Sequence, residues 1–182
     1  LTGKSSPQGK LPVSFPWCVG QIPVYYNSDA TGRPYLRGED QDRFRSRYLD
    51  IPNEPLYPFG FGQTYTSFEV SAVRLNRNQM RQGEQIYASV KVKNTGNKAG
   101  TETVQMYIQD VAASVVRPVK ELKGIRRVTL EPGAEACVFF EIAEEQLKFH
   151  RANGQYESER GLFRVFIGNC STTENKAEFV LC

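Results

Sequence analysis

The stretch IYASVKVKNTGN, residues 86–97, decides the fold. Apolar side chains occupy every second position from Ile86 to Val92, and polar or amphipathic residues stand between them. Successive side chains of a β-strand point to opposite faces, so this alternation predicts a strand with one buried face. The segment Asn94-Thr95-Gly96-Asn97 follows at once, and its residue types tolerate a positive φ and favour a tight turn.

The same pattern recurs through residues 67–182. Six further runs predict strands, at 68–75, 104–109, 122–130, 138–142, 162–167 and 177–181. Glu131-Pro132-Gly133 is a strong turn signal, and no helical pattern is longer than residues 144–149. Seven short strands separated by turns predict an antiparallel β-sandwich of the immunoglobulin or fibronectin type III kind. The single tryptophan, Trp17, lies outside this region, so the antibody pattern of Cys, Trp and Cys is absent and the fibronectin branch is favoured.

Residues 1–66 have a different composition. They contain eight of the ten prolines and eleven of the 21 aromatic residues of the chain. This predicts extended loops with fixed proline conformations and one short strand around residues 11–15. A core of their own is not expected, because no long amphipathic helix and no set of strands is present. Residues 1–66 are therefore expected to be the end of a larger domain, and residues 67–182 a separate one.

The bulk composition narrows the class of partner. The chain has 182 residues, 40% of them hydrophobic, and a net charge of +3 from 23 basic and 20 acidic residues. This balance gives no electrostatic reason to expect nucleic acid or an acidic membrane as a partner. No run approaches the roughly 20 apolar residues of a membrane helix. No signal peptide is visible at the start, where the chain is expected to begin within a longer protein.

The four cysteines do not have the spacing of a metal site. Cys18, Cys137, Cys170 and Cys182 are scattered without a CxxC pair, so a zinc site is not expected. Cys170 and Cys182 flank the last predicted strand, and a disulfide between them is the alternative to the free thiols that we favour.

Three groups of residues carry a resemblance to a known family. They are GKLPVSFP at 9–16, then SRYLD at 46–50 with PLYPFGFGQTYTSF at 55–68, then VKNTG at 92–96, GTETVQMY at 100–107 and RPVKELKG at 117–124. In this order they resemble the C-terminal part of family 3 glycoside hydrolases, most closely the periplasmic β-glucosidases of Gram-negative bacteria. The resemblance covers nearly the whole chain. Gln63 departs from the pattern, since the family usually has a small aliphatic residue such as leucine there.

The resemblance implies an architecture and a function. Such enzymes consist of an N-terminal (β/α)8-type barrel, an α/β sandwich and a fibronectin type III-like domain. Residues 1–66 would be the C-terminal tail of the α/β sandwich, and residues 67–182 the complete fibronectin type III-like domain. The expected function is that of an accessory part of a periplasmic or secreted β-glucosidase, which removes terminal non-reducing β-D-glucosyl residues. Its partners would be the catalytic domains of the parent enzyme, which bind the glucoside substrate, and a second copy of the chain if the enzyme is a homodimer. The resemblance implies no cofactor.

Catalysis by this segment alone is not expected. Retaining glycosidases need two carboxyl groups about 5–5.5 Å apart, one as nucleophile and one as acid and base. The resemblance places the nucleophilic Asp in the barrel and the acid/base Glu upstream of residue 9. No residue of this chain is therefore assigned to catalysis, substrate binding or a metal.

Some local side chains have a possible functional role that we rank second. We interpret one cluster of carboxylates and arginines as a solvated loop and rank a sugar-binding loop second. Its members are Arg37, Glu39, Asp40, Asp42, Arg43, Arg45 and Arg47. Four tyrosines are expected to pack rather than to stack on sugars: Tyr25, Tyr26, Tyr35 and Tyr48. Residues 25–50 are nevertheless the part expected to lie nearest the active site of the parent enzyme. His150, the single histidine, is expected on a surface or half-buried strand because it has no partner for a triad.

Two segments are expected to contact other domains. The string PLYPFGFG at 55–62 is interpreted as an interdomain clamp in which Phe59 and Phe61 fill a groove. Residues 114–120 are expected to be a long connection that docks against the catalytic domains.

Two functions of other classes stay open at this point. A carbohydrate-binding module would need a row of exposed aromatics, for which the candidates are Tyr87, Tyr107, Phe139 and Tyr156. A cell-surface adhesin would fit the sandwich, but it leaves residues 9–16 and 58–62 unexplained.

Overall fold

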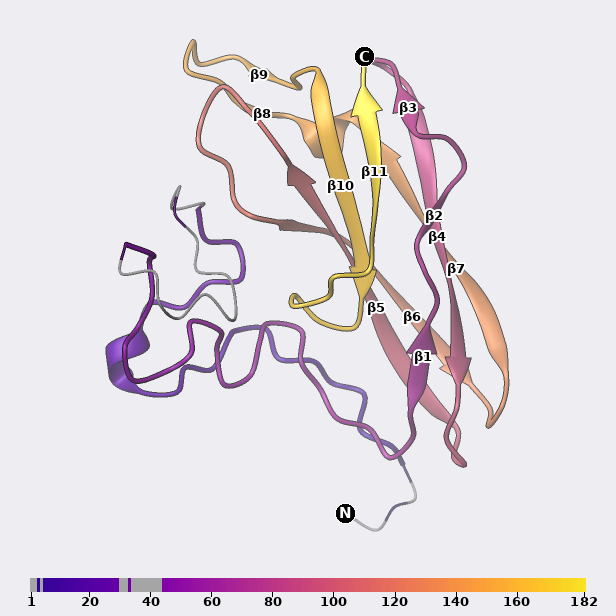
Figure 1. The fold of residues 1–182 in the computed structure, drawn as a ribbon. Helices are drawn as coiled ribbons and strands as arrows, with labels where there is room; N and C mark the ends of the chain where they lie inside the picture. Colours follow the sequence, from indigo (N-terminus) through magenta and orange to yellow (C-terminus); the bar gives the residue numbers. More distant parts are fainter. Residues whose placement is uncertain (1–2, 4, 30–32, 34–43) are drawn as a thin grey trace.

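The protein is mainly β, as predicted. The computed structural model describes residues 3, 5–29, 33 and 44–182 (Figure 1). Within these residues there is no α-helix, and the only helical turns are the 3-10 turns η1 (Val19–Gln21) and η2 (Glu144–Leu147). Every strand lies in the second part of the chain, from Phe68 onward. The described residues hold no helix whose length and apolar character would let it span a bilayer.

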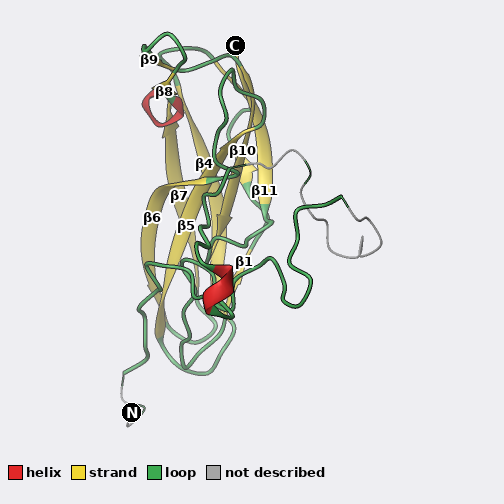
Figure 2. Cartoon of the chain, turned by 90° about the vertical axis from the view of Figure 1, so that its left-hand side faces the viewer, coloured by secondary structure: helices red, strands yellow, loops and turns green. Residues whose placement is uncertain are grey.

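Two facing sheets form the sandwich (Figures 1 and 2). The four-stranded sheet has β4 at its centre and consists of β1 (Phe68–Val70), β2 (Arg74–Leu75), β4 (Gln85–Asn94) and β7 (Glu135–Ala143). The five-stranded sheet runs, in spatial order, β3 (Gln79–Met80), β11 (Lys176–Leu181), β10 (Gly161–Gly168), β5 (Gly100–Asp110) and β6 (Glu121–Leu130). A separate hairpin pairs β8 (Phe149–His150) with β9 (Tyr156–Glu157).

The seven predicted strands are present, but the first one is divided. β1 and β2 both pair with β4, and residues 71–73 leave the ladder between them. The side chain of Asn175 takes their backbone groups, because its Nδ2 donates to the Ser71 carbonyl and its Oδ1 accepts from the Val73 amide. β3, β8 and β9 were not predicted, since two residues are too short to show an alternating pattern.

The core lies between the two sheets. The inward side chains of β4, from Ile86 to Val92, are buried as their alternation predicted. Phe140 and Ile142 of β7 come from the same sheet, and Phe163 of β10 stacks on Phe179 of β11 from the other at 5.5 Å. Each large aliphatic or aromatic side chain removed from water contributes about 1.5–3 kcal/mol, so this interior accounts for the cohesion of the sandwich.

Residue types that tolerate a positive φ led us to predict the turn at residues 94–97, but no residue in it has a positive φ. Asn94 is fully buried, and its Nδ2 donates to the carbonyls of Lys98, at 2.7 Å, and Leu130, at 2.9 Å. Its Oδ1 accepts a hydrogen bond of 2.6 Å from the Thr66 hydroxyl. Side-chain hydrogen bonds of this buried amide therefore shape the turn.

We call residues 5–66 the tail, and its described residues, 5–29, 33 and 44–66, follow an extended path beside the five-stranded sheet (Figures 1 and 2). The prediction of a regular strand at residues 11–15 is wrong. Only single backbone pairings form, with Phe15 bridged to Tyr57 and the Leu11 amide donating to the Phe61 carbonyl at 2.8 Å. Prolines at positions 12 and 16 lack the amide hydrogen that a longer ladder needs.

All four cysteines are free thiols. β10 and β11 are antiparallel neighbours, with Gly161 opposite Leu181 and Phe166 opposite Lys176. Cys170 and Cys182 therefore stand at opposite ends of this hairpin. The alternative of a disulfide between them is wrong, because bridged Cα atoms lie within about 7 Å of each other.

Candidate functional site

A stripe of three residues on β5 joins the tail to the sandwich; we call Glu102, Gln105 and Tyr107 the β5 stripe. Gln105 is 2% exposed, and its Nε2 donates to the carbonyls of Gly60, at 3.2 Å, and Asn169, at 2.9 Å. Its Oε1 accepts a hydrogen bond from the Tyr107 hydroxyl. One buried amide thus holds the tail and the loop after β10 together, with its donor and acceptor atoms both bonded.

The second member of the stripe forms a buried ion pair. Lys10 Nζ lies 2.7 Å from Glu102 Oε1, and the two side chains are 13% and 4% exposed. The same Glu102 oxygen accepts a hydrogen bond of 2.7 Å from the Thr103 amide. Because the carboxylate is out of water, it depends on these partners, and loss of either would leave an uncompensated charge.

The third member continues into an aromatic stack. Tyr107 is fully buried and meets the ring of Tyr26 edge-on at 5.8 Å, and Tyr26 stacks on Phe59 at 4.3 Å. Burial raises the pKa of the Tyr107 hydroxyl far above its usual range, and the nearby Cys170 and Tyr26 add to the shift. The hydroxyl therefore stays protonated and remains a donor to Gln105.

The clamp predicted at residues 55–62 meets the sandwich through its backbone. The ring of Phe59 stacks on Tyr26, which also belongs to the tail, and the Phe59 carbonyl accepts a hydrogen bond of 2.9 Å from the Ser171 amide. Phe61 likewise packs within the tail, with its ring 5.0 Å from that of Tyr57. The contact with the sandwich therefore depends on Phe59 and on the backbone around Gly60.

The connection at residues 114–120 docks on the tail. The Val119 amide donates to the Ser28 carbonyl at 2.9 Å, and Pro118 bridges to Asp29. Arg117 lies 4.4 Å above the ring of Phe149 and pairs with Glu121. The contact made by this segment is thus with residues 28–29 of the same chain.

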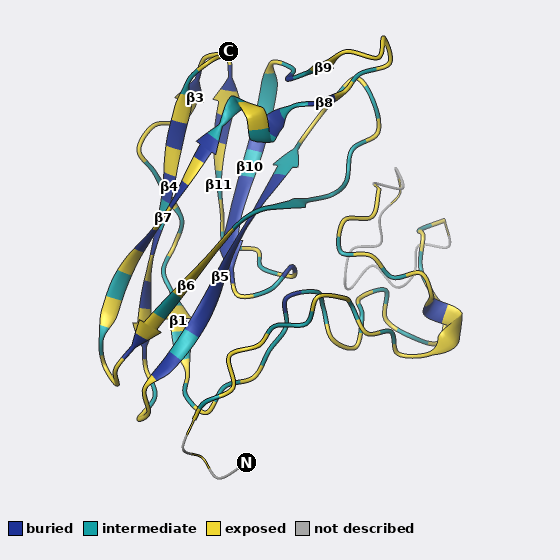
Figure 3. Ribbon diagram, turned by 180° about the vertical axis from the view of Figure 1, so that it is seen from behind, coloured by how far each residue is buried: buried dark blue, intermediate teal, exposed yellow. Residues whose placement is uncertain are grey.

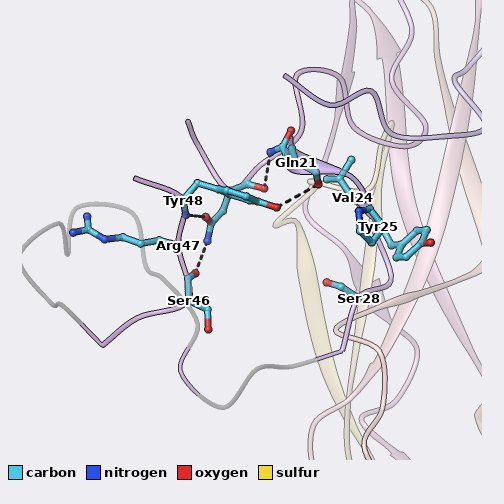
Figure 4. Close-up of a pocket in the computed structure, with 9 residues that line it drawn as sticks. Gln21, Val24, Tyr25, Ser28, Ser46, Arg47 and Tyr48 are labelled. Atoms are coloured by element: carbon cyan, nitrogen blue, oxygen red, sulfur yellow. Dashed lines mark hydrogen bonds between the residues drawn. The ribbon is translucent and has the colours of Figure 1, made fainter. Parts of the chain in front are cut away.

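A hollow of about 430 Å³ lies inside the tail (Figure 4). The Tyr48 hydroxyl donates to the Gln21 carbonyl at 3.3 Å, and Asn53 ties the Tyr48 amide to the Ser46 carbonyl. In Figure 4 the Arg47 and Tyr25 side chains extend to opposite sides. The polar and aromatic groups therefore do not converge on one point, as a sugar site would require.

An apolar groove of about 680 Å³ runs along the other part of the tail. Leu11, Phe15, Tyr57, Phe61 and Tyr65 supply its hydrophobic lining. The rings of Phe15 and Tyr57 meet edge-on at 6.3 Å, and both side chains remain at least 40% exposed. Exposed aromatic surface of this kind marks a contact region.

Most of the exposed large hydrophobic side chains among the described residues belong to the tail. Among the described residues, twelve of the nineteen exposed large hydrophobics belong to it: Val13, Phe15, Trp17, Val19, Ile22, Tyr25, Phe44, Tyr48, Leu49, Leu56, Tyr57 and Tyr65. The sandwich, by contrast, buries its large apolar side chains between the sheets. The tail therefore exposes the kind of surface that a partner covers.

The half-buried carboxylates of the sandwich have structural partners. Glu159 binds the Ser114 amide at 2.8 Å and Arg151 at 2.6 Å, and the hydrogen bonds from Ser114 lower its pKa. Asp110 differs, because burial raises its pKa and its Oδ2 has no hydrogen-bond partner. Nor do the described residues bring three His, Cys, Asp or Glu side chains together in a way that would hold a metal ion.

The remaining sequence candidates do not form a common site. Most of the mixed-charge loop and Tyr35 lie outside the described residues. His150 is exposed on β8 and packs against Tyr156 at 5.0 Å, as expected for a surface strand. Of the aromatics proposed for carbohydrate binding, Tyr107 is fully buried, whereas Tyr87, Phe139 and Tyr156 are exposed. The β5 stripe was missed, because Gln105 and Tyr107 occupy the positions that the alternation assigns to solvent.

Comparison with known proteins agrees with this architecture. The family model of the fibronectin type III-like domain matches residues 102–171. The periplasmic β-glucosidase of Salmonella typhimurium is 49% identical over all of this chain and 24% of its own length. Thermostable β-glucosidase B of Acetivibrio thermocellus is 38% identical over 94% of this chain and 23% of its own.

Solved structures give the same result. A β-glucosidase from Listeria innocua superposes with a TM-score of 0.94 and 45% identity, over all of this chain and 25% of that one. A family 3 β-glucosidase from Bifidobacterium adolescentis has a TM-score of 0.74 and 28% identity, over 98% of this chain and 26% of that one. The chain thus spans about a quarter of the length of these relatives.

The fold and the family match define a fibronectin type III-like domain, preceded by a tail that packs on it. The chain itself corresponds to the C-terminal, fibronectin type III-like segment of family 3 β-glucosidases.

Proposed function

We propose that this chain is the non-catalytic, accessory C-terminal part of a retaining, periplasmic or secreted β-glucosidase. The parent would hydrolyse terminal non-reducing β-D-glucosyl residues with catalytic domains that precede this segment. Residues 1–66 would complete the α/β sandwich domain of that parent, and residues 67–182 would form a separate accessory domain. The role of the chain would be to hold the tail against the sandwich and to offer its apolar face to the catalytic domains.

The observation that carries the proposal is the exposed apolar surface of the tail. Trp17 is 49% exposed, and Val19 and Leu49 are 84% and 90% exposed. At about 25 cal/mol per Å², covering such side chains stabilises an interface, whereas leaving them in water does not. Relatives about four times as long supply a candidate cover, namely the part of their chains that this segment does not match.

Absence of turnover is the first expectation. Purified chain added to an aryl β-glucoside should release no more phenol than buffer, because the family resemblance places the nucleophilic Asp and the acid/base Glu outside this chain. Turnover that follows the chain through purification would overturn the non-catalytic part of the proposal.

Docking is the second expectation. The Salmonella typhimurium relative, shortened by the segment that this chain matches, should bind the chain in a gel-filtration assay. Phe15→Ser in the groove should weaken this binding at least tenfold, because it removes apolar contact area from the interface. Phe139→Ser is the matched control, since Phe139 is 60% exposed but lies on the four-stranded sheet. Equal effects of the two substitutions would contradict the assignment of the tail as the docking face.

A further inference from the structure

The tail has no apolar core of its own. Every buried large hydrophobic among the described residues lies at or after Met80, so the tail contributes none. Among the tail residues that the structure describes, the one buried side chain is that of Gln21, whose Nε2 donates to the backbone carbonyls of Pro52, Asn53 and Glu54. Without hydrophobic burial, the entropy of ordering the described residues of the tail must be offset from elsewhere.

That support comes from one strand of the sandwich. Lys10 reaches Glu102, the Gly60 carbonyl accepts from Gln105, and Tyr26 meets Tyr107. These three contacts start from well-separated points of the tail and end within six residues of β5. They hold both of the tail segments that pair with each other through single backbone hydrogen bonds, such as the one of 2.8 Å from the Gly60 amide to the Leu11 carbonyl.

At Gly60 any other residue would have to adopt a positive φ and displace the Gln105 side-chain amide. The φ of Gly60 is +80°, and an added Cβ would lie within van der Waals overlap of the Gln105 side-chain amide. Backbone and amide can approach this closely only because glycine has no side chain. The geometry therefore pairs one particular glycine of the tail with one particular glutamine of the sheet.

The loop after β10 completes the docking surface. The Asn169 carbonyl accepts the second hydrogen of the Gln105 amide, and the Ser171 amide donates to Phe59. Lys120 holds this loop in place, because its Nζ donates to the carbonyls of Ser171, at 3.1 Å, and Thr173, at 3.0 Å. β5 and this loop thus present a prepared set of donors and rings to the tail.

We propose that the surface formed by Glu102, Gln105 and Tyr107 of β5, with the loop at residues 169–173, is a docking surface whose partner is the tail of the same chain. The tail takes its structure from this surface and not from a core of its own. This docking has a consequence that rests on the proposed function. The sandwich sets the position of the apolar face that the tail offers to the catalytic domains. Release of the tail would then leave the sandwich folded.

Hydrogen exchange on the intact chain tests this surface. Gln105→Leu removes all three hydrogen bonds of the side-chain amide, and Gln109→Leu is the matched control on the same strand and the same face, where the described residues of the tail make no hydrogen bond. In Gln105→Leu, peptides covering Leu11–Phe15 and Tyr57–Phe61 should exchange at least about tenfold faster, whereas peptides of β4 should keep their wild-type rates. Gln109→Leu should leave both regions unchanged.

A second variant keeps the test decisive if Gln105→Leu does not fold. Lys10→Met changes only the tail and should give the same selective acceleration, because it leaves Glu102 buried without its cation. Three results would overturn the proposal: a wild-type tail that exchanges like an unfolded peptide, a tail unaffected by both variants, or equal acceleration of tail and β4. Because the chain is measured by itself, failure to bind a catalytic part would not alter these readings.

Discussion

The outer faces of the two sheets have similar alternating sequences and different surroundings. On β4 the outward side chains, such as Tyr87 and Lys91, are exposed to water. On β5 the corresponding side chains, Gln105 and Tyr107, are 2% and 0% exposed, because the tail covers them. Figure 3 shows this difference as the nearly continuous burial of β5 beside the alternating colours of β4.

This difference teaches how a polar face can be buried at acceptable cost. A buried polar group is tolerated when its hydrogen-bonding atoms are satisfied. Gln105 meets this condition through Gly60, Asn169 and Tyr107, and Glu102 through Lys10. The covered face is therefore specific to the tail, whereas the open face of β4 needs no partner.

The two ion pairs should give the largest contrast. Lys10→Met leaves Glu102 charged and buried, and we expect it to lower the free energy that holds the tail on the sandwich by about 3–5 kcal/mol. Lys91→Met breaks a pair with Glu135 whose side chains are 59% and 54% exposed, and should cost under about 1 kcal/mol. Hydrogen exchange of the tail peptides measures the first cost, and urea titration measures the second. Equal costs would mean that Glu102 becomes hydrated when Lys10 is lost.

Two glycines with positive φ separate backbone strain from close contact. Gly133, with φ +76° in an open turn, should tolerate alanine at a cost of about 1–2 kcal/mol from strain alone. Gly60→Ala adds the collision with Gln105, so we expect about 2–4 kcal/mol. Thermal unfolding should show the larger drop in Tm for Gly60→Ala. A reversed order would place Gly60 away from Gln105 in solution.

Two tyrosine hydroxyls provide a finer test. Tyr107→Phe removes the donor to Gln105 Oε1 and leaves that buried oxygen unsatisfied, at a cost of about 1–2 kcal/mol. Tyr87→Phe removes an exposed contact with Gln85 and should change stability by less than about 0.5 kcal/mol. Chemical denaturation of the two variants in parallel makes the measurement. A neutral Tyr107→Phe would show that water replaces the hydroxyl.

The smallest effects should come from two carboxylates with opposite pKa shifts. Burial raises the pKa of Asp110 above its ordinary value of 3.8, so its charged form opposes folding at neutral pH and not below that value. Asp110→Asn should therefore stabilise the protein at pH 7, with the gain vanishing below about pH 3.8. Melting curves at several pH values measure this gain.

Glu159 should behave in the opposite way. Hydrogen bonds from Ser114 hold its pKa below 4.5, so its contribution to stability is present above that pH and is lost as pH falls through the folded-state pKa. Glu159→Gln should therefore destabilise the protein at pH 7 and have little effect in strong acid. The same sign for both substitutions at pH 7 would show that burial and hydrogen bonding do not act on the two groups as described.

Much of the fold could be predicted from the sequence, and the candidate site could not. The strands at 86–93 and 138–142 follow from period-2 alternation, and the resemblance carried by residues 55–68 agrees with the relatives found. The break at residues 71–73 could not be predicted, because it depends on Asn175, a hundred residues away. The burial of Gln105 likewise depends on a segment that is distant in sequence.

The sequence by itself determined that residues 67–182 form a sandwich with its apolar side chains inside, because alternation is a local property that the chain carries in every strand. Only the tertiary structure decided which outward face meets water and which meets the tail. That choice depends on the sum of several long-range contacts, namely those of Lys10 with Glu102, Gly60 with Gln105 and Tyr26 with Tyr107. No local pattern marks such contacts, since each joins residues that become neighbours only after folding.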